Sequence, residues 1–313
     1  MRASEMTAGV RSDDSAPPLS RPVPKRPVRC CICASDAYDV LYADELGDRP
    51  AKVDYAFSRE TRKTYQIVKC RGCGLVYTNP MPNLDGQYAD TVDSHILESR
   101  DQRHHAAERE IARIQRHKSG GRLLDIGCST GFFLDVAARH FEVEGIEPSR
   151  WAREQAAQRH TVHSATVADM SERFDVVTLW DVIEHFQDPA AEVAAIRRLL
   201  RADGLLVIHT GDIDAWLPRL LRKSWWWFQG MHLHFFSRAT LTRLLNDTGF
   251  DVIEVGINTR YFRLFSLSNS LMRYPVGKLL SPILNLPGLR NLMVPIHLSG
   301  EMLMLARKRA AAR

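Results

Sequence analysis

Residues 122–137 read RLLDIGCSTGFFLDVA, and this stretch decides the fold. Arg122–Cys128 has the composition of a short apolar strand. It leads into a loop with Gly127 and Gly131, in which Ser129 replaces the usual middle glycine, and an apolar stretch with helical period follows. Strand, glycine-bearing loop and helix form the pattern that nucleotide-binding α/β folds require, and the first N–H groups of such a helix are open to a polar ligand. The stretch therefore predicts an α/β fold whose loop binds a nucleotide-like ligand.

Two acidic residues indicate what kind of ligand the loop holds. The next apolar run, Phe141–Ile146, ends in Glu147, and a carboxylate at the end of a second strand is placed to accept both hydroxyls of a ribose. Asp125 lies at the end of the first strand, where an acid is unfavourable beside a pyrophosphate but suits a cationic ligand. S-adenosylmethionine has an ammonium, a sulfonium and no phosphate, so these residues favour it over NAD. The chain lacks the G-x-x-x-x-G-K-[ST] pattern here, which excludes a P-loop.

The cysteines form a second pattern. Two C-x-x-C knuckles supply four thiolates: Cys30, Cys33, Cys70 and Cys73. Four thiolates can close a tetrahedral Zn²⁺ shell, and with no open coordination position such a site is structural. Cys31 is then a spare thiol, and the alternative is that all of these are ordinary buried or free cysteines. The pattern predicts a four-cysteine zinc ribbon over residues 30–80.

Further segments carry a resemblance to a known family. They read LLDIGCSTGFFLDVA, EGIEPS, FDVVTLWDVIEHFQDP, LLRADGLLVIHT and HLHFFSRATLTRLLNDTGF, and they lie within residues 122–258. In this order they resemble the class I S-adenosylmethionine-dependent methyltransferases. With the preceding CxxC…CxxCG they are similar to the zinc-ribbon branch, which includes antibiotic-sugar C-methyltransferases and many enzymes of surface-polysaccharide pathways. The resemblance implies a Rossmann-like, doubly wound, mostly parallel seven-stranded sheet.

The resemblance also implies roles for individual residues. The cofactor-binding set comprises the loop residues Asp125, Gly127, Ser129 and Gly131, then Glu147 for the ribose, Asp169 near the adenine, and Trp180 and Asp181 at the cofactor face. Plain core packing is the alternative for Trp180. Glu184 and His185 are catalytic candidates that either face the methyl group or cap the helix that Asp188-Pro189 begins, since proline suits the first helical position.

A histidine is the predicted general base. Methyl transfer is an in-line displacement, so the enzyme must align the nucleophile and often remove its proton. A histidine near its ordinary pKa of about 6.5 suits this at neutral pH. Relatives carry a Glu-His pair before an aromatic-Phe-Ser ending, and in sugar C-methyltransferases that pair is implicated in catalysis. Aligning on Phe236-Ser237 puts His232 on the histidine and Met231 on the missing carboxylate. The alternative for His232 is a loop histidine that binds only backbone.

Three consecutive tryptophans, Trp225–Trp227, precede this histidine. They cannot all be buried on one strand face, so at least one should be half-exposed, lining a substrate cleft or touching a lipid interface. A packed lid is the alternative.

The formal net charge of +5 hides a division along the chain. Residues 1–29 carry +3, residues 30–258 carry −6 and residues 259–313 carry +8. The basic, proline-rich residues 1–29 are predicted to form a disordered tail. No apolar segment of secretory type follows the first arginines, which indicates a cytoplasmic protein. In that reducing compartment metal binding by cysteines outranks disulfides.

The strongly basic end contains an apolar segment, residues 259–299, which is rich in Leu, Phe, Met and Pro. We expect a helical insertion before the last strand of a core made of residues 81–258 and 300–313. Short apolar helices with basic flanks are compatible with lying on an anionic membrane at its inner face. A cap over the substrate cleft or a dimer surface is the alternative. No apolar run reaches the roughly 18 residues of a membrane span, and the acidic body opposes a nucleic-acid footprint.

These patterns together predict a zinc-ribbon methyltransferase that acts on a small metabolite or a glycan precursor, including a lipid-linked sugar. An alternative acceptor is a quinone- or phenol-like ring, because DVIEH at residues 181–185 also resembles O-methyltransferases of that group, although the ribbon argues against it. A second alternative is a catalytically silent binding module, and the departures Ser129 and Met231 leave it open.

Overall fold

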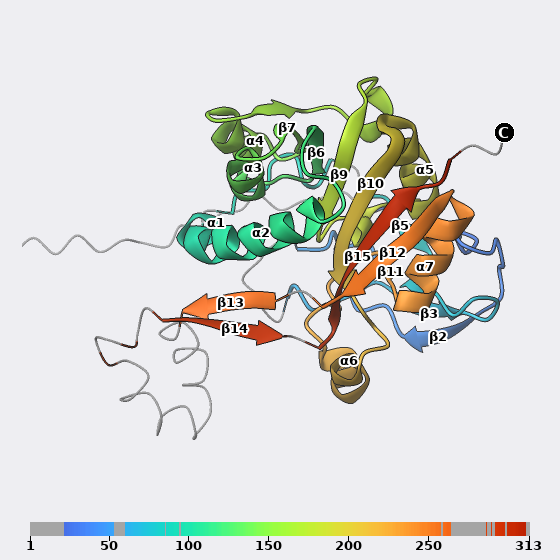
Figure 1. The fold of residues 1–313 in the computed structure, drawn as a ribbon. Coiled ribbons are helices and arrows are strands. Elements are labelled where there is room, and N and C mark those ends of the chain that lie inside the picture. The colour runs from blue at the N-terminus through green and yellow to red at the C-terminus, as the bar shows by residue number, and fades with distance from the viewer. Residues whose placement is uncertain are drawn as a thin grey trace, which may run out of the picture.

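The computed structural model describes residues 22–52, 60–84, 86–93, 95–257, 259–263, 286, 289, 292–297 and 299–310. Its centre is a seven-stranded sheet in the order β12–β15–β10–β9–β6–β7–β8 (Figure 1). The strands are β6 Arg122–Ile126, β7 Glu142–Ile146, β8 Thr161–His163, β9 Phe174–Trp180, β10 Leu200–Gly211, β12 Phe250–Gly256 and β15 Glu301–Lys308. β15 runs antiparallel to both of its neighbours, and the other pairings are parallel. This confirms the predicted mostly parallel, seven-stranded sheet.

Helices cover both faces of the sheet. They are α1 His95–Glu98, α2 Arg100–Gln115, α3 Phe132–Ala137, α4 Arg150–Ala157, α5 Pro189–Leu199, α6 Trp216–Leu221 and α7 Arg238–Asp247, with short 3₁₀ turns η1 Val167–Asp169, η2 Ile183–His185 and η3 Arg222–Ser224. Figure 1 shows α2 and α3 on one side of the sheet and α5 and α7 on the other. Ile111 and Leu134 are buried on the first side, and Ile196 and Leu244 on the second. The arrangement is doubly wound, as expected.

The start of α5 answers one question that the sequence left open. The Asp188 side chain accepts hydrogen bonds from the backbone N–H groups of Ala190 and Ala191, both at 3.1 Å, and Pro189 is the first helical residue. Asp188 is therefore the cap of this helix. Glu184 and His185 lie in η2 instead, so they do not cap α5.

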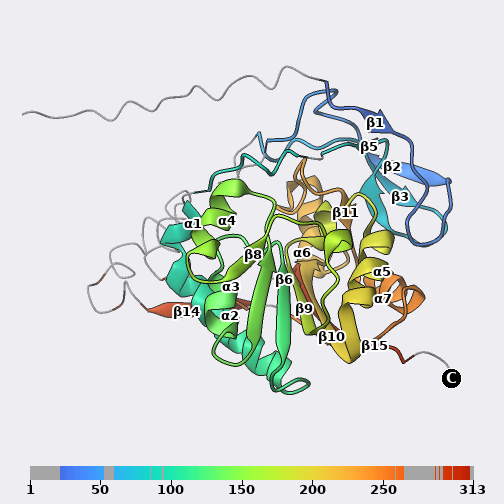
Figure 2. The same cartoon turned by 90° about the horizontal axis from the view of Figure 1, so that it is seen from above.

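A second, four-stranded sheet carries the cysteines. Its order is β11–β4–β3–β2, formed by β2 Tyr38–Tyr42, β3 Ile67–Cys70, β4 Val76–Thr78 and β11 His234–Phe235. Three strands lie within the predicted ribbon, but β11 comes from the loop after the tryptophans. Figure 2 shows β2 and β3 beside the end of the core that also holds β11. The predicted ribbon and the core therefore share this sheet.

Two predictions are wrong for the residues that the structure describes: the extent of the disordered tail and the helical ends of the insertion. Within the tail predicted as disordered, β1 Lys25–Arg26 pairs antiparallel with β5 Met81–Pro82, and Val23 is buried. Residues 1–21 lie outside the described part. The insertion was expected to be helical, but its described ends form two antiparallel strands, β13 Thr259–Arg263 and β14 Met293–His297. β13 and β14 extend along α2 (Figure 1).

Most of the residues between β13 and β14, including the segments expected to be helical, lie outside the described part. Of the helices that the structure does describe, none has the length and apolarity needed to cross a bilayer.

Candidate active site

The glycine loop follows β6 and bends sharply before α3. Gly127 has φ +73°, and a Cβ placed on it would lie 2.6 Å from Cγ2 of Val182, so a side chain there meets both strain and a clash. Gly131 precedes α3 with φ +82°. Ser129 has φ +50°, which a non-glycine residue rarely adopts. The serine thus keeps the conformation of the glycine that it replaces, and the loop geometry fits the predicted cofactor role.

Glu147 braces this loop from the end of β7. Its Oε2 accepts a hydrogen bond from the backbone N–H of Ser129 at 2.8 Å, and its Oε1 accepts one from the N–H of Ser149 at 2.7 Å. Burial raises the pKa of Glu147 against the effect of these two hydrogen bonds. Each carboxylate oxygen has a second lone pair, so the group can still accept ribose hydroxyls.

Asp125 lies deeper, on β6, with 1% of its surface exposed. The hydroxyl of Thr178 on the neighbouring β9 donates a hydrogen bond to its Oδ1 at 2.6 Å. Burial, with a smaller contribution from Glu147, raises the pKa of Asp125 to about 8 despite the Thr178 hydrogen bond. Without a cation beside it, this carboxyl is mostly protonated at neutral pH, and a bound cation would favour its ionisation.

Two further residues of the predicted cofactor set make other contacts. Asp169 is exposed and accepts hydrogen bonds from the backbone N–H and the hydroxyl of Thr166, which caps η1. Trp180 is half-buried, and its ring packs 4.8 Å from that of Phe133 on α3. Trp180 therefore packs against the core on this side, which was the alternative to a cofactor contact. Its Nε1 is buried without a hydrogen-bond partner among the described residues.

The catalytic candidates meet at the carboxyl end of β9. The rings of His185 and His232 are 4.7 Å apart between centroids, and one ligand-type atom of each, with one of Glu184, lie within 4.8 Å of one another. Residues 47 positions apart in sequence thus form one cluster. The prediction did not bring these groups together, because it placed each only by its neighbouring strand.

Backbone carbonyls fix the tautomers of both histidines. Nδ1 of His232 lies 2.7 Å from the carbonyl oxygen of Trp227, and Nδ1 of His185 lies 3.0 Å from that of Met231. A carbonyl can only accept, so each Nδ1 carries the hydrogen and each neutral ring has its lone pair on Nε2. The hydroxyl of Tyr88 also lies 2.9 Å from Nδ1 of His185. Met231, aligned with the missing carboxylate, contributes its carbonyl instead.

Burial changes the acid–base properties of this cluster. It lowers the pKa of His232 to about 3, with help from the charge of His185. The sequence argument assumed an ordinary histidine, and in this respect it is wrong. Burial raises the pKa of Glu184 to about 8, and Asp181 adds to the effect. Oε2 of Glu184 accepts a hydrogen bond from Thr210, while Oε1 is buried without a partner among the described residues. At neutral pH the cluster holds two neutral imidazoles beside a largely protonated acid.

The tryptophan run forms the wall next to these histidines. Trp225 and Trp227 are buried and stack with ring centroids 6.1 Å apart, whereas Trp226 is half-buried. The ring of Trp227 lies 5.3 Å from that of His232. The expectation that at least one of the three stays partly exposed is confirmed, and the other two are packed.

The four cysteines of the two knuckles converge. Sγ of Cys30 lies 3.4 Å from that of Cys73, Sγ of Cys33 lies 3.5 Å from that of Cys70, and all four lie within 4.8 Å of one another. None of them is in a disulfide. A tetrahedral zinc site with bonds of about 2.3 Å has sulfurs about 3.8 Å apart. The donor set therefore fits zinc.

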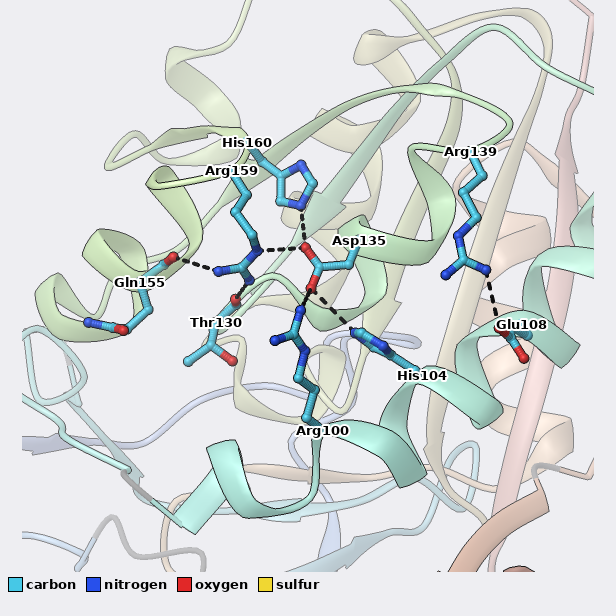
Figure 3. A network of polar contacts seen from close by, with 9 residues as sticks. All are labelled: Arg100, His104, Glu108, Thr130, Asp135, Arg139, Gln155, Arg159 and His160. Carbon is cyan, nitrogen blue, oxygen red and sulfur yellow. Dashed lines mark hydrogen bonds and ion pairs between the residues drawn. The ribbon is translucent and has the colours of Figure 1, made fainter.

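A polar network that the sequence did not reveal holds α3 in place (Figure 3). Asp135, in the first turn of α3, accepts contacts from four cationic or potentially cationic groups on α2 and after α4: Arg100, His104, Arg159 and His160. Arg159 Nε and His160 Nε2 lie 2.8 and 2.6 Å from Oδ1. Arg159 also donates to the carbonyl of Thr130 at 2.8 Å. One carboxylate thus ties the glycine loop to the two flanking helices.

The family of the chain follows from its similarity to known proteins. A family model described as a methyltransferase domain matches residues 99–255, which is half of the chain. The chain belongs to the class I S-adenosylmethionine-dependent methyltransferase family. The match covers α2 through β12, including the glycine loop, Glu147 and the histidine cluster.

Similar proteins cover parts of this methyltransferase. It is 30% identical over 153 residues to a ubiquinone biosynthesis O-methyltransferase of Cereibacter sphaeroides, covering 43% of this chain and 62% of that protein. A protein of the same name from Alkalilimnicola ehrlichii is 35% identical over 104 residues, 29% of this chain and 42% of the other. The chain thus spans about three fifths or less of these relatives.

Among solved structures, a chain from the complex of the Haloferax volcanii Trm112 methyltransferase activator with a methyltransferase aligns with a TM-score of 0.51. It is 14% identical and covers 70% of this chain and 95% of that chain. At this identity the likeness concerns the fold alone.

Proposed function

We propose that the protein transfers a methyl group from S-adenosylmethionine to a hydroxyl of a quinol- or phenol-like ring. The observation that carries this is the cluster of His185 and His232, whose rings lie beside the aromatic side chains Tyr88 and Trp227 and whose Nδ1 atoms are held by backbone carbonyls, which leaves Nε2 as the basic nitrogen. A neutral imidazole can take the proton of a hydroxyl, and aromatic walls suit a ring-shaped acceptor. The ubiquinone-pathway names of the similar proteins support the same acceptor class.

The chain's own residues divide the work of binding. The bound cosubstrate would supply the methyl group from its sulfonium. Glu147 would accept the ribose hydroxyls, and Asp125, once its proton has left, would supply a negative charge for the cationic end. The Gly127 turn keeps side chains away from the loop. These residues orient and neutralise charge, which is the larger part of catalysis in an in-line displacement.

His232 is proposed as the group that accepts the acceptor's proton. The acceptor oxygen gains the methyl group, the carbon–sulfur pair stays on sulfur, and the hydroxyl proton moves to Nε2. Burial penalises the imidazolium, but the sulfonium loses its positive charge in the same step, so the total charge of the site is unchanged. The low pKa of His232 without ligand is therefore compatible with a role as base during transfer.

The test measures release of S-adenosylhomocysteine with a panel of quinols, phenols, nucleotide sugars and lipid-linked sugars. We expect turnover with the aromatic hydroxyls and a loss of about 100-fold in His232→Gln. His234→Gln is the matched control, because His234 is another buried histidine of the same loop that stacks on Tyr77. Cofactor binding without turnover on any acceptor would favour the silent binding module.

A glycan precursor is the second candidate acceptor. The observation that favours it is the cysteine-bearing sheet, which resembles the zinc-ribbon branch and includes β11 beside the histidine loop. Methylation of the nucleotide or lipid-linked sugars, with no activity on the aromatic hydroxyls, would select this candidate.

We also propose that Cys30, Cys33, Cys70 and Cys73 hold one structural zinc ion. The convergence of four unpaired thiols supports this, and close approach supports it further: a Cβ on Gly72 would lie 3.0 Å from Sγ of Cys33. The ion would stabilise the β2–β3–β4 sheet.

We also propose that the protein makes a peripheral contact with an anionic membrane at its inner face. On α6 the side chains of Trp216 and Leu220 are 66% and 69% exposed. Pro218 of the same helix packs against Gly300, which joins the basic insertion to β15. One end of the basic segment 259–299 therefore adjoins α6. Flotation with anionic vesicles should recover the protein, and the double variant Trp216→Ser, Leu220→Ser should remain at the bottom. Equal flotation with neutral vesicles would refute the role of the lipid charge in this contact.

A further inference from the structure

A buried histidine outside the predicted site connects three neighbouring strands. His209 lies on β10 with 3% of its side chain exposed. Its Nδ1 is 2.5 Å from Oδ1 of Asp181, just after β9, and its Nε2 is 3.3 Å from Oε2 of Glu301, the first residue of β15. Both ring nitrogens thus face carboxylates, and a ring that donates to two carboxylates carries two protons.

The surroundings favour that charge. Burial by itself would lower the pKa of His209, but Asp181 and Glu301 outweigh it and raise the pKa to about 10. The rings of Trp180 and Trp227 lie 6.2 and 6.3 Å from that of His209. The two facing carboxylates therefore favour a doubly protonated His209 ring over a neutral imidazole.

The two carboxylates differ in their exposure to solvent. The Glu301 side chain is fully buried, whereas that of Asp181 is 42% exposed. Asp181 has φ +57°, an unfavourable conformation for a non-glycine residue that persists where its surroundings impose it. The next residue, Val182, touches the turn at Gly127. Asp181 therefore stands at the edge of the glycine loop, at the carboxyl end of a parallel strand, where ligands bind in such sheets.

We infer that His209 is a positioning residue: held by Glu301, it fixes the Asp181 carboxylate toward the acceptor, where Asp181 accepts a hydrogen bond from a second donor group of the acceptor and not from the hydroxyl that is methylated. The inference rests on the proposed methyl transfer and names a residue that contacts the acceptor. An ionised carboxylate can only accept a hydrogen bond, and the hydroxyl that is methylated gives its one proton to His232, so Asp181 binds and orients the acceptor through another donor group. His232 remains the group that takes the proton.

Other titratable groups face this chain of contacts. Glu110 on α2 and Glu184 in η2 act on His209 through their charge. Asp181 in turn acts on Glu184, His185 and His232. A pH profile therefore reports several groups, and the decisive measurement must observe His209 directly.

Nitrogen NMR of ¹⁵N-histidine in the full-length protein provides that measurement, with His209 assigned through His209→Gln. At pH 8 we expect both nitrogens of His209 to be protonated, whereas His185 and His232 each show one unprotonated nitrogen. A wild-type His209 with an unprotonated nitrogen at pH 8 overturns the inference. This arm needs no acceptor, so its failure is distinct from a failure to find methyl transfer.

Kinetics then separates positioning from mere stability. His209→Gln and Glu301→Gln should lower kcat about tenfold with little change in cofactor affinity, and should move the acid limb of the pH profile upward, because Asp181 loses a neighbouring cation. Glu192→Gln, on α5, is the control for loss of a half-buried carboxylate, and its acid limb should stay in place. An unchanged acid limb in His209→Gln overturns the inference. If that variant does not fold, through-bond assignment from the backbone identifies the His209 signals in the wild-type spectrum, and that spectrum decides.

Discussion

Cofactor binding should release a proton from Asp125. The carboxyl is buried and has a pKa of about 8 without ligand. If the ligand's ammonium and sulfonium require the ionised form, the protein must lose a proton before it binds well. Linkage then gives an affinity that falls about tenfold between pH 7 and pH 6, or about 1.4 kcal/mol. At pH 7 about 0.9 protons should leave for each cofactor bound. The sign follows from the shift: a raised pKa in the free protein means tighter binding at higher pH.

Calorimetry with S-adenosylmethionine in two buffers of different ionisation enthalpy counts these protons. The window from pH 6 to pH 7 is chosen because the ligand's own α-amino group, with a pKa of about 7.7 to 8.0, stays mostly protonated there. Asp125→Asn keeps the shape of the side chain and a hydrogen-bond acceptor for Thr178. In this variant, binding should be weaker, nearly independent of pH and free of proton release.

The control separates Asp125 from its acidic neighbours. Asp169→Asn should leave the proton count unchanged, because hydrogen bonds from Thr166 lower the pKa of Asp169 and keep it ionised throughout. Burial also raises the pKa of Glu147, so Glu147 is a second candidate for the carboxyl group that releases the proton. Proton release that survives in Asp125→Asn but disappears in Glu147→Gln would refute the reasoning about Asp125, as would binding without proton exchange.

Three further outcomes are expected. Asp135→Asn should lower the free energy of unfolding by about 2 kcal/mol, measured with urea at pH 7, because it leaves the surrounding cations without their carboxylate; Asp90→Asn, at a side chain that is 86% exposed, should change it little. Since Arg159 and His160 lower the pKa of Asp135 against the effect of burial, its contribution is present at neutral pH and is lost as pH falls through the folded-state pKa. Cys70→Ser should reduce bound zinc below half an equivalent while Cys31→Ser retains one, and equal loss in both would contradict the four-cysteine site. Gly127→Ala should weaken cofactor binding more than tenfold, because its Cβ meets Val182 at 2.6 Å.

The central sheet was predicted from two sources. Apolar runs and a local loop signal placed strands such as β6 and β9, whereas the seven-stranded, mostly parallel arrangement came from the family resemblance, because strands such as β7 and β8 carry little apolar signal. Asp125 and Glu147 were placed correctly at strand ends. The pairing of β1 with β5 and of β11 with β4 joins segments of two or three residues that carry no periodic signal. The antiparallel strands β13 and β14 pair residues that are separated by about thirty positions in an apolar segment. Composition alone had predicted helices for this segment.

The site was predictable in its parts but not in its chemistry. Glu184, His185 and His232 were identified as residues, yet their pKa values depend on burial, which is set only when the tryptophan wall and η2 close around them. His209 and Glu301 were missed because they meet only through β15, which pairs Gly211 with Glu301 across a separation of ninety positions. A histidine within an apolar strand gives no signal until its partners are known.

The shared sheet connects the cysteine-bearing strands to the loop that holds His232. The backbone N–H of Thr78, at the end of β4, donates to the carbonyl of Leu233 at 2.8 Å, and the N–H of Leu233 donates to the carbonyl of Glu184 at 2.8 Å. Cys70 and Cys73 lie just before β4, and His232 adjoins Leu233. Two hydrogen bonds therefore link the cysteine-bearing sheet to both halves of the histidine cluster, whereas the glycine loop follows β6 and is held separately by Glu147 and Arg159. A structural ion at the cysteines would consequently act on the acceptor side of the site and leave the cofactor side to the core.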